Sequence, residues 1–553
     1  MSIKKLSFLF LVVLAVNFSA SSQRTFRISK NMSLFNAVFR ELETNYVDTL
    51  NYDKMLQTAV GEMLAELDPY TVFLPEEETD DLTFMTTGEY GGIGALITKY
   101  GKNVCVSEPY EGMPAQKNDV RAGDIFLEID GTKVSELSVG EVSAMLRGVP
   151  NTPIKLKLQR YGEKKPLVRE FMREKIQLHP IAYSKVLDEK VGYIMLNDFT
   201  DRAAIEFKET VNQLIKEHDI QSIIIDIREN GGGLVDEAVK ILGYFVPKGT
   251  EVVKIIGKNP LSTHVYKTPA EPLFPNIKLA VLVSRGSASA SEILAGAIQD
   301  LDRGIIVGER TFGKGLVQNI RPLGYGAHLK VTTAKYYIPS GRCIQAIDYS
   351  HRNGDGSVGR VPDSLTTEFT TLHGRKVRDG GGIVPDIKIN DESNLNISYY
   401  LYTQQMYFDF ATQYVVNHTV IAKPSEFQLS DNDFAEFVNF LKEKNFTYST
   451  QTEKYFEDLI KMAKIEGLDA EAKDEIEQLR QKFKPDIEKN LAANRADISR
   501  ILAAEIIKRY YFQRGEIEYS LRDDKVLNAA LENLQQDEIY QDILGNVKNL
   551  QKK

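Results

Sequence analysis

The chain has 553 residues, more than one hydrophobic core usually organises, so we expect several domains. Its apolar content of 42% and charged content of 26% are ordinary for a soluble globular protein. The formal net charge of −9 argues against a nucleic-acid partner, because chains that bind polyanions usually carry an excess of positive charge.

The N-terminus has the three-part layout of a secretory signal. Lys4 and Lys5 precede an apolar run that ends at Val16, and small polar residues follow up to Ser22. The run is shorter than the roughly 20 residues that cross a bilayer, so an uncleaved anchor is the weaker alternative. We predict a signal peptide over residues 1–22 and an exported, periplasmic protein, which is membrane-associated only if the signal stays uncleaved.

Helical periodicity over residues 33–67 predicts two helices within an N-terminal helical region at 23–85. Short strands punctuated by glycine follow, with one helix near 139–147, and they predict a compact β-rich module over residues 86–172. Cys105 and Cys343 lie far apart in strand-like runs, which favours two buried thiols over a disulfide.

Between residues 173 and 390, apolar strands alternate with helices of roughly ten or more residues, which indicates a mainly parallel sheet covered on both faces. Residues 391–553 are helical and charged, with the clearest amphipathic helix at 491–512. This last region favours packing or oligomerisation over chemistry. No histidine lies at ligand spacing from another histidine or a cysteine, so we predict no metal and no cofactor.

A serine cluster, GSASASEILAGAIQD at 286–300, follows the strand-like run LAVLVS and begins a predicted helix. A strand, a tight turn and a helix in this order expose a nucleophile at the edge of a sheet. Ser289 followed by Glu292 also forms a capping box, and the cluster alone is better explained by that cap than by a nucleophile. Asp300 ends the predicted helix, where it either pairs with Arg303 or has a direct role.

A lysine between two glycines follows in GERTFGKGLVQ at 308–318. If the chain is extended there, Lys314 and Gln318 share a face, and the glutamine amide is able to hold the amine. A lysine titrates at about 10.4, and burial lowers the pKa of such an amine toward that of a useful base. The alternative is a lysine that only caps a turn. A competing base, His328, looks like a plain strand histidine because no acid lies at a suggestive spacing.

A third motif, IRENGGGLV at 227–235, places three glycines directly after a strand. Bare amides in such a turn suit the charge that develops on a carbonyl oxygen during acyl transfer. Glycine-rich turns also bind phosphate, but no Gly-Lys-Ser or Gly-Lys-Thr sequence supports a nucleotide loop.

Taken in order, these motifs resemble the C-terminal processing peptidases, also called tail-specific proteases, which join a PDZ domain to a serine-lysine protease core. The resemblance covers roughly residues 33–390 and rests on LDPYT, GGIGALI, the M-P-A…R-A-G-D-I…I-D-G pattern, DIRENGGG, GSASASEILAGAIQD, GERTFGKGLVQ, YYIPSGRCIQ and GIVPDI. It implies a multidomain α+β fold, with a PDZ domain at 86–172 next to an α/β protease core at 173–390, flanked by N-terminal and C-terminal helical regions.

The resemblance also implies a role for each candidate site residue. The roles are Ser289 as nucleophile, Lys314 as general base, Gln318 as the residue that orients the lysine, Asp300 as an aspartate that the family needs, and the amides of Ala290 and of Gly233, in preference to Gly232, as oxyanion donors. In the PDZ module, the candidates for capturing a tail carboxylate are Gly92, Ile93, Gly94 and Ala95.

We therefore predict an exported serine endopeptidase that takes proteins with exposed apolar C-termini and cleaves at or near their tails with a Ser-Lys dyad. The C-terminal helical domain would carry any contacts with a second copy or an adaptor. A catalytically inactive PDZ scaffold that binds C-termini is the main alternative. An esterase or acyltransferase acting on small substrates is the third, although it would have no use for a peptide-binding module.

Overall fold

The computed structural model describes residues 3–76, 84–187, 190–258, 263–352, 357–390, 396–470 and 472–545, with side chains from residue 23 onward. The chain divides into two compact units, residues 1–75 with 321–330 and residues 76–320 with 331–553. The predicted signal peptide, residues 1–22, lies outside the described side chains. Within the described part of the chain, no helix is both long and apolar enough to span a bilayer.

The first unit contains two helices and a short strand pairing. Its elements are α1 (Ile3–Asn45), α2 (Tyr52–Ala65), β1 (Val72–Leu74) and the start of β18 (Ala327–Tyr337). Strand β1 runs antiparallel to residues 328–330, so His328 lies in a strand as predicted. The carboxylate of Asp68 accepts hydrogen bonds from the backbone amides of Tyr70 and Thr71 at 2.9 and 2.8 Å, which turns the chain from α2 into β1.

The predicted PDZ module contains a six-stranded sheet, in which β3, β4, β5, β7 and β8 pair in that order and β6 pairs with β5. Its elements are β3 (Ala95–Tyr100), β4 (Asn103–Pro109), α4 (Pro114–Lys117), β5 (Ile125–Ile129), β6 (Thr132–Lys133), α5 (Val139–Leu146), β7 (Pro153–Gln159) and β8 (Leu167–Met172). The chain enters and leaves through a two-stranded ribbon, in which β2 (Glu89–Gly92) pairs with β9 (Glu174–Gln177). Among the described residues β3 pairs with β4 alone, so it is an edge strand.

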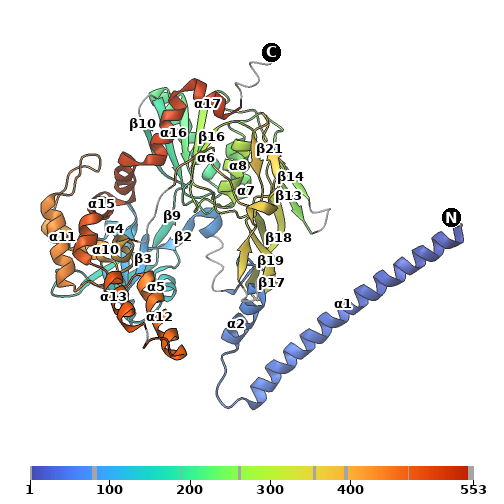
Figure 1. Ribbon diagram of the computed structural model, residues 1–553, viewed down its shortest axis with the longest axis horizontal. Coiled ribbons are helices and arrows are strands. Elements are labelled where there is room, and N and C mark those ends of the chain that lie inside the picture. Colours follow the sequence, from blue (N-terminus) through green and yellow to red (C-terminus); the bar gives the residue numbers. More distant parts are fainter. Residues whose placement is uncertain are drawn as a thin grey trace. The chain divides into compact units, whose positions relative to one another are not determined.

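The predicted protease core is built on a six-stranded sheet in the order β10-β11-β12-β15-β16-β23, parallel except for β10 (Figure 1). Its strands are β10 (Ile181–Leu187), β11 (Val191–Leu196), β12 (Ser222–Asp226), β15 (Lys278–Val283), β16 (Ile305–Gly308) and β23 (Ile387–Lys388). Three helices follow strands of this sheet: α6 (Ala203–His218), α7 (Val235–Leu242) and α8 (Ala290–Asp300).

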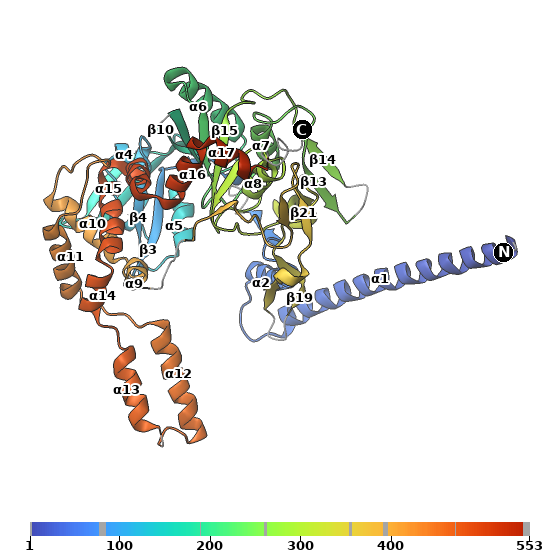
Figure 2. The ribbon, with the colours of Figure 1, turned by 45° about the horizontal axis from the view of Figure 1, so that its top comes forward.

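Alternate residues of each central strand point to opposite faces of the sheet, as the pleat of a strand requires, and different helices cover the two faces. Ile223 and Ile225 of β12 are buried in the cluster that includes α6, α7 and α8. Ile224 between them belongs to a second cluster, formed with the last helices of the chain, α16 (Lys525–Gln535) and α17 (Asp537–Ile543). Both ribbon views place these helices beside the sheet (Figures 1 and 2). Helices α16 and α17 therefore supply the second cover of this sheet.

Several smaller elements belong to the same part of the chain. They are β13 (Glu251–Gly257), β14 (His264–Lys267), β17 (Leu316–Gly324), β19 (Ile347–Arg352), β20 (Val358–Arg360), η4 (Asp363–Leu365), β21 (Glu368–Thr370) and β22 (Lys376–Arg378). Strand β13 pairs with residues 334–337 of β18 and with β14. Cys105 is buried in β4, and Cys343 is half-buried in the segment after β18.

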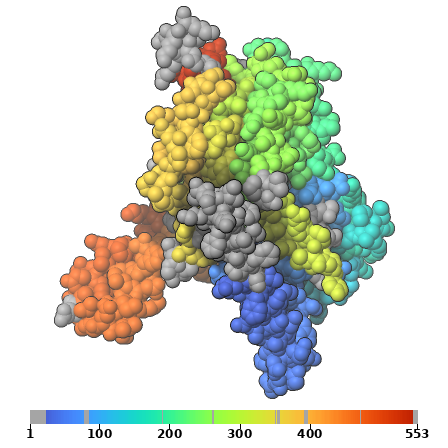
Figure 3. Space-filling model, turned by 90° about the vertical axis from the view of Figure 1, so that its right-hand side faces the viewer, coloured from blue at the N-terminus to red at the C-terminus, as the bar shows by residue number. Residues whose placement is uncertain are grey.

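The remaining C-terminal helices have an aromatic core of their own. They are α9 (Ile397–Thr403), α10 (Met406–Asn417), α11 (Asp431–Glu443), α12 (Gln451–Glu466), α13 (Lys473–Phe483), α14 (Ile487–Ala493), α15 (Arg495–Ser520) and the turn η5 (Leu521–Asp523). Helices α12 and α13 lie in the orange lobe of Figure 3. Helix α15 extends beyond the predicted 491–512 and is broken at Phe512, where φ is 55°. The predicted fold class is confirmed.

Candidate active site

Ser289 lies in a tight turn between the end of β15 at Val283 and the start of α8 at Ala290. Its backbone has φ 57° and ψ −115°, a conformation that side-chain-bearing residues rarely adopt. Strained turns of this kind lift a nucleophile's side chain out of the backbone at the top of a parallel sheet. The sequence therefore predicted the local geometry of the serine turn correctly.

The hydroxyls of the two neighbouring serines in the cluster donate hydrogen bonds to backbone carbonyls. The Ser287 hydroxyl donates to the Ile227 carbonyl at 2.7 Å, and the Ser291 hydroxyl donates to the Asn230 carbonyl at 2.8 Å. Both serines are fully buried, whereas Ser289 is only half-buried. Ser289 is therefore the serine of this cluster that a substrate can reach.

One buried carboxylate connects the serine turn to the lysine loop. Oε2 of Glu292 accepts the backbone amides of Ser289 at 3.0 Å and of Lys314 at 2.8 Å. Oε1 accepts the hydroxyl of Thr311 at 2.6 Å and the amide of Gly313 at 2.8 Å. The contact between Glu292 and the Ser289 amide belongs to the predicted capping box, so the same residue caps α8 and fixes the lysine loop.

The protonation state of Glu292 decides how many of these hydrogen bonds survive. The side chain is fully buried, and burial raises its pKa to about 7 although the four donors favour the ionised form. An ionised carboxylate is an acceptor at both oxygens, whereas a protonated one turns part of one oxygen into a donor. The arrangement around Glu292 therefore suits the ionised form.

Tyr336 forms a second bridge between the same two segments. Its buried hydroxyl lies 3.1 Å from the Ser289 carbonyl oxygen and is also hydrogen-bonded to the Lys314 carbonyl. Because a hydroxyl has a single proton, the two carbonyls share it. Tyr336 begins the motif YYIPSGRCIQ, but the sequence analysis gave it no role, since its partners are distant in sequence.

Lys314 is half-buried, and the extended chain predicted after it is present, because β17 begins at Leu316. The amide nitrogen of Gln318 donates to the Thr332 hydroxyl at 3.1 Å. The role of Gln318 in orienting the lysine stays a prediction.

The three-glycine turn lies directly against the serine turn. A Cβ atom added to Gly232 would come within 2.8 Å of the Ser289 Cβ and 2.9 Å of the Ala290 nitrogen. The Gly232 amide donates to the side-chain oxygen of Asn230 at 2.9 Å, so this amide already has a hydrogen-bond acceptor. Within the described part of the chain, no acceptor is found for the amides of Gly233 and Ala290. This pattern favours Gly233 over Gly232 as an oxyanion donor.

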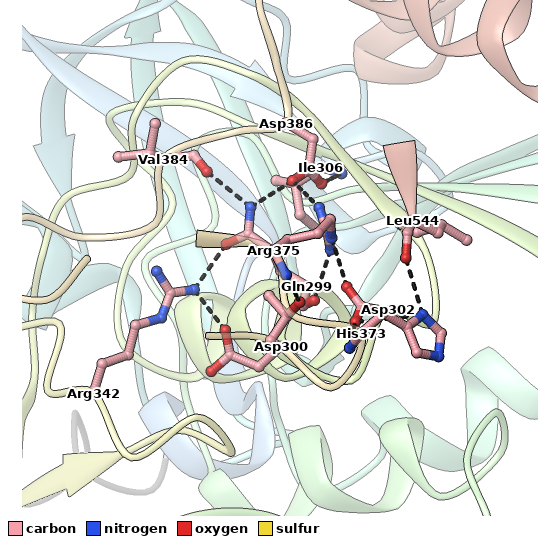
Figure 4. A network of polar contacts seen from close by, with 11 residues as sticks. Gln299, Asp300, Asp302, Ile306, Arg342, His373, Arg375, Val384, Asp386 and Leu544 are labelled. Carbon is pink, nitrogen blue, oxygen red and sulfur yellow. Dashed lines mark hydrogen bonds and ion pairs between the residues drawn. The ribbon is translucent and has the colours of Figure 1, made fainter. Parts of the chain in front are cut away.

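Asp300 does not pair with Arg303, contrary to one of the two sequence-based alternatives. It accepts a hydrogen bond from Nη2 of Arg342 at 2.8 Å and one from the Ser340 amide at 3.0 Å (Figure 4). Arg303 instead donates to backbone carbonyls, including that of Phe245. Spacing of three residues suggested a pair that the fold does not make.

Asp300 is also far from the serine turn. It ends helix α8, which begins just after Ser289 and has 11 residues. At a rise of 1.5 Å per residue, the two residues are about 15 Å apart along the helix. Asp300 therefore supports the segment that contains Arg342 and does not touch the reacting atoms.

The polar network around Asp300 extends to Leu544, beside the last helix (Figure 4). Arg375 donates to Asp302 and to Asp386, at 2.6 Å in each case. Nδ1 of His373 lies 2.9 Å from the carbonyl oxygen of Leu544, just after α17. The far end of α8 is thus anchored to the C-terminal cover of the sheet.

In the PDZ module, the predicted carboxylate-binding residues form the turn that leads into the edge strand β3. The carbonyls of Ile93 and Gly94 accept amides of Ala115 and Tyr110, at 2.8 and 2.9 Å. No acceptor is found for the amides of Ile93 and Gly94 among the residues that the structure describes. Gly94 has φ 71°, and an added Cβ would come within 2.5 Å of a Met113 carbon. Bare amides beside a free strand edge suit capture of a peptide carboxylate.

Known proteins match this chain over several segments. Family models match it as "Peptidase family S41" at residues 190–350, "PDZ domain" at 105–160 and "Probable PDZ-protease, C-terminal helical domain" at 397–534. A carboxy-terminal-processing protease from Bartonella bacilliformis is 34% identical over 340 residues, which cover 61% of this chain and 77% of that protein. The chain belongs to peptidase family S41.

Two further proteins are similar to this chain over part of its length. A probable CtpA-like serine protease from Staphylococcus aureus is 35% identical over 318 residues, which cover 57% of this chain and 62% of the relative, less than two thirds of its length. The structure of a photosystem II D1 C-terminal processing protease is 29% identical, covering 65% of this chain and 88% of that chain with a TM-score of 0.35. The chain is thus a serine peptidase of the carboxy-terminal-processing type.

No group of His, Cys, Asp and Glu side chains within the described ranges is arranged to hold a metal ion. Sequence reasoning proposed Ser289, Lys314 and the glycine turn as site residues, but it gave Tyr336 no role and interpreted Glu292 only as a helix cap. The four hydrogen bonds that Glu292 accepts include three from residues 311–314, and no local pattern in either segment predicts them.

The first prediction concerns pH. Since burial raises the pKa of Glu292 to about 7, lowering the pH through 7 protonates the carboxyl and removes hydrogen bonds to the Ser289 or Lys314 segment. Peptidase activity should therefore fall below about pH 7. In Thr311→Val, one donor that lowers this pKa is lost, so the acidic limb of the rate profile should move to higher pH. If the acidic limb does not move in this variant, the group that titrates there is not Glu292.

The second prediction separates support from catalysis at Asp300. In Asp300→Asn, the buried guanidinium of Arg342 loses its counter-charge, which costs about 3–5 kcal/mol in buried pairs. We expect a lower unfolding temperature and an activity loss that follows the unfolded fraction. The double variant Asp300→Asn/Arg342→Gln should lose less stability than the sum of the two single changes. A fully stable but inactive Asp300→Asn would contradict this assignment.

Proposed function

We propose that this chain is an exported endopeptidase that recognises the C-terminal tails of proteins through its PDZ module and cleaves them with a Ser289–Lys314 dyad. The observation that carries the proposal is the double bridge between the two segments. Glu292 accepts the amides of Ser289 and Lys314, and Tyr336 contacts the carbonyls of the same two residues. The two residues of a dyad must be held at a fixed distance and orientation, and these bridges hold the two backbone segments together.

In the proposed mechanism, the Ser289 hydroxyl attacks the scissile carbonyl while the neutral amine of Lys314 takes its proton. Charge then develops on the carbonyl oxygen, where the unpaired amides of Gly233 and Ala290 donate hydrogen bonds. Lys314 returns the proton to the leaving amine, and an acyl-enzyme remains at Ser289. The C-terminal fragment leaves as that amine. Water, deprotonated by Lys314, then attacks the ester carbonyl, Lys314 returns this proton to the Ser289 oxygen, and the shortened protein leaves with its new carboxylate.

The PDZ module would deliver the substrate. A peptide strand added to the edge of β3 would place its terminal carboxylate against the amides at Gly92, Ile93, Gly94 and Ala95. Leu96 of β3 is half exposed, and the partly buried Met145 belongs to α5 opposite that strand. These apolar side chains favour tails that end in an apolar residue. Contacts with a second copy or an adaptor through the C-terminal helices stay a prediction, as does periplasmic export.

Two other functions compete with this proposal. An inactive scaffold would need neither the strained backbone at Ser289 nor the engaged amides around it, which argues against that function. A small-molecule esterase would use the same serine but would gain nothing from the PDZ module. Comparing turnover of a small ester with that of a protein bearing an apolar tail distinguishes the esterase from the peptidase.

The third prediction tests the dyad. Ser289→Ala should abolish cleavage of a protein with an apolar tail, because no nucleophile remains. Lys314→Ala should slow cleavage by at least about 10²- to 10⁴-fold, the range for loss of a general base. Both variants should keep the wild-type unfolding temperature. Lys335→Ala, which removes an exposed lysine of β18, is the control and should cleave normally. Persistent cleavage by Ser289→Ala would refute the proposed mechanism.

The fourth prediction tests tail capture. A fluorescent peptide with an apolar C-terminus should bind the Ser289→Ala protein, and its C-terminal amide should bind at least about tenfold more weakly, because it lacks the charge-assisted hydrogen bonds. Gly94→Ala should weaken binding similarly, since the new methyl group would collide with Met113.

The matched control for the binding assay is Gly101→Ala. Gly101 also has a positive φ, of 56°, but an added Cβ there meets nothing within 4 Å. Gly101 follows the far end of β3 and is remote from the carboxylate-binding turn. Equal binding of the acid and the amide by the wild-type module would exclude recognition of a free C-terminus.

A further inference from the structure

The glycine turn of the site is connected to the last helices of the chain by a buried ion-pair chain. Asp226 ends β12, and its Oδ2 accepts the Tyr193 hydroxyl at 2.6 Å. The same carboxylate accepts Nε of Arg228 at 3.0 Å and pairs with its Nη2 at 2.5 Å. Nη2 also lies 2.7 Å from Oδ2 of Asp524, in the segment that begins α16. The guanidinium therefore bridges two carboxylates from distant parts of the sequence.

Asp524 uses its two oxygens for different tasks. Oδ1 caps α16 by accepting the amides of Val526 and Leu527, at 2.9 and 3.0 Å. Oδ2 is left for Arg228. The Asp524 side chain is 11% exposed and that of Arg228 is 23% exposed, so water screens this pair far less than a surface pair. Burial lowers the pKa of Arg228, but the two aspartates outweigh burial and hold it above its ordinary value.

Arg228 lies at the start of the turn that carries the candidate oxyanion donor. Its own amide donates to Asp226 at 3.0 Å, which fixes the path of the backbone as it leaves the strand. Two residues later, the carbonyl of Asn230 accepts the Ala288 amide at 3.0 Å and the Ser291 hydroxyl at 2.8 Å. The turn is thus held on the serine side by Asn230 and on the sheet side by Arg228.

The C-terminal segment that provides Asp524 is firmly attached to the sheet. The Tyr540 hydroxyl lies 3.0 Å from the Leu279 amide and 3.2 Å from the Leu279 carbonyl oxygen, in the middle of the protease core. Leu527 and Leu534 of α16 are buried against the same face of the sheet. Since α16 cannot shift without breaking these contacts, Asp524 is a fixed point for the guanidinium.

We infer that Asp524, a residue of the C-terminal helical region, is a positioning residue for peptide hydrolysis that acts through Arg228 on the Gly231–Gly233 turn. This inference rests on the proposed function, because it gives the turn a task in stabilising the oxyanion. It also gives the last helices a role in catalysis beyond covering the sheet.

The test compares cleavage by Asp524→Ser with that by Asp523→Ser in the full chain. Serine keeps the helix cap, so α16 should remain, but its hydroxyl is too short to reach Arg228. Asp523 is exposed and precedes Asp524 directly, which makes it the matched control. We expect kcat of Asp524→Ser to fall roughly ten- to a hundredfold, with KM and the unfolding temperature close to those of the control.

A second readout separates positioning from general damage. A peptide aldehyde forms a bond between its carbonyl carbon and the Ser289 oxygen, and the resulting oxygen occupies the oxyanion site. Its inhibition constant should rise by the same factor by which kcat/KM falls, while binding of a tail peptide to the PDZ module should not change. Asp524→Asn keeps the length and the cap and tests the charge if the serine variant does not fold.

The inference is overturned if kcat of the folded Asp524 variant stays within about twofold of the control, or if the whole loss lies in KM. Failure of the proposed function would look different. In that case Ser289→Ala would still cleave, and the aldehyde would not inhibit the wild-type protein, whatever the Asp524 variants do.

Discussion

The site depends on one buried carboxylate that accepts backbone amides from two segments. Ser289 and Lys314 are 25 residues apart in sequence and come from different loops at the carboxyl end of the sheet. Backbone amides of both segments converge on Oε2 of Glu292, and Thr311 and Gly313 add to Oε1. Since the acceptor is fully buried, the geometry is insensitive to motion of exposed side chains. Burial makes the ionised form costly, so the same contact that orders the site also makes it sensitive to pH.

The sequence predicted the parts of the site that depend on local chemistry. A strand followed by small residues and a helix predicted the turn at Ser289, and three glycines predicted a turn whose amides are accessible. Close packing explains why the glycines are needed, because a side chain on Gly232 would collide with Ser289. Neither feature requires knowledge of a distant partner, and both follow from the conformational limits of the backbone.

Other features depend on partners that the sequence does not reveal. Spacing suggested that Asp300 pairs with Arg303, yet its partner is Arg342, 42 residues away in the segment after β18. Tyr336 of β18 contacts the carbonyls of Ser289 and Lys314, and periodicity within a strand does not indicate such a contact. The sequence predicted a sheet covered on both faces, but not that the last helices form one of the covers, since amphipathic helices do not show which surface they bury.

The two faces of the protease sheet have different relations to the site. Helices α6, α7 and α8 follow strands directly, so the loops that bear Ser289 and the glycine turn arise from the ordinary βα alternation. The opposite face is covered by α16 and α17, which come from the far end of the chain and hold the sheet through Tyr540 and a row of leucines. At one end of this cover, Asp524 pairs with Arg228, which begins the glycine turn. At the other end, the carbonyl of Leu544 contacts His373, which belongs to the Asp300 network. A change that loosens the last helices would therefore act on the site through both the glycine turn and the Asp300 network.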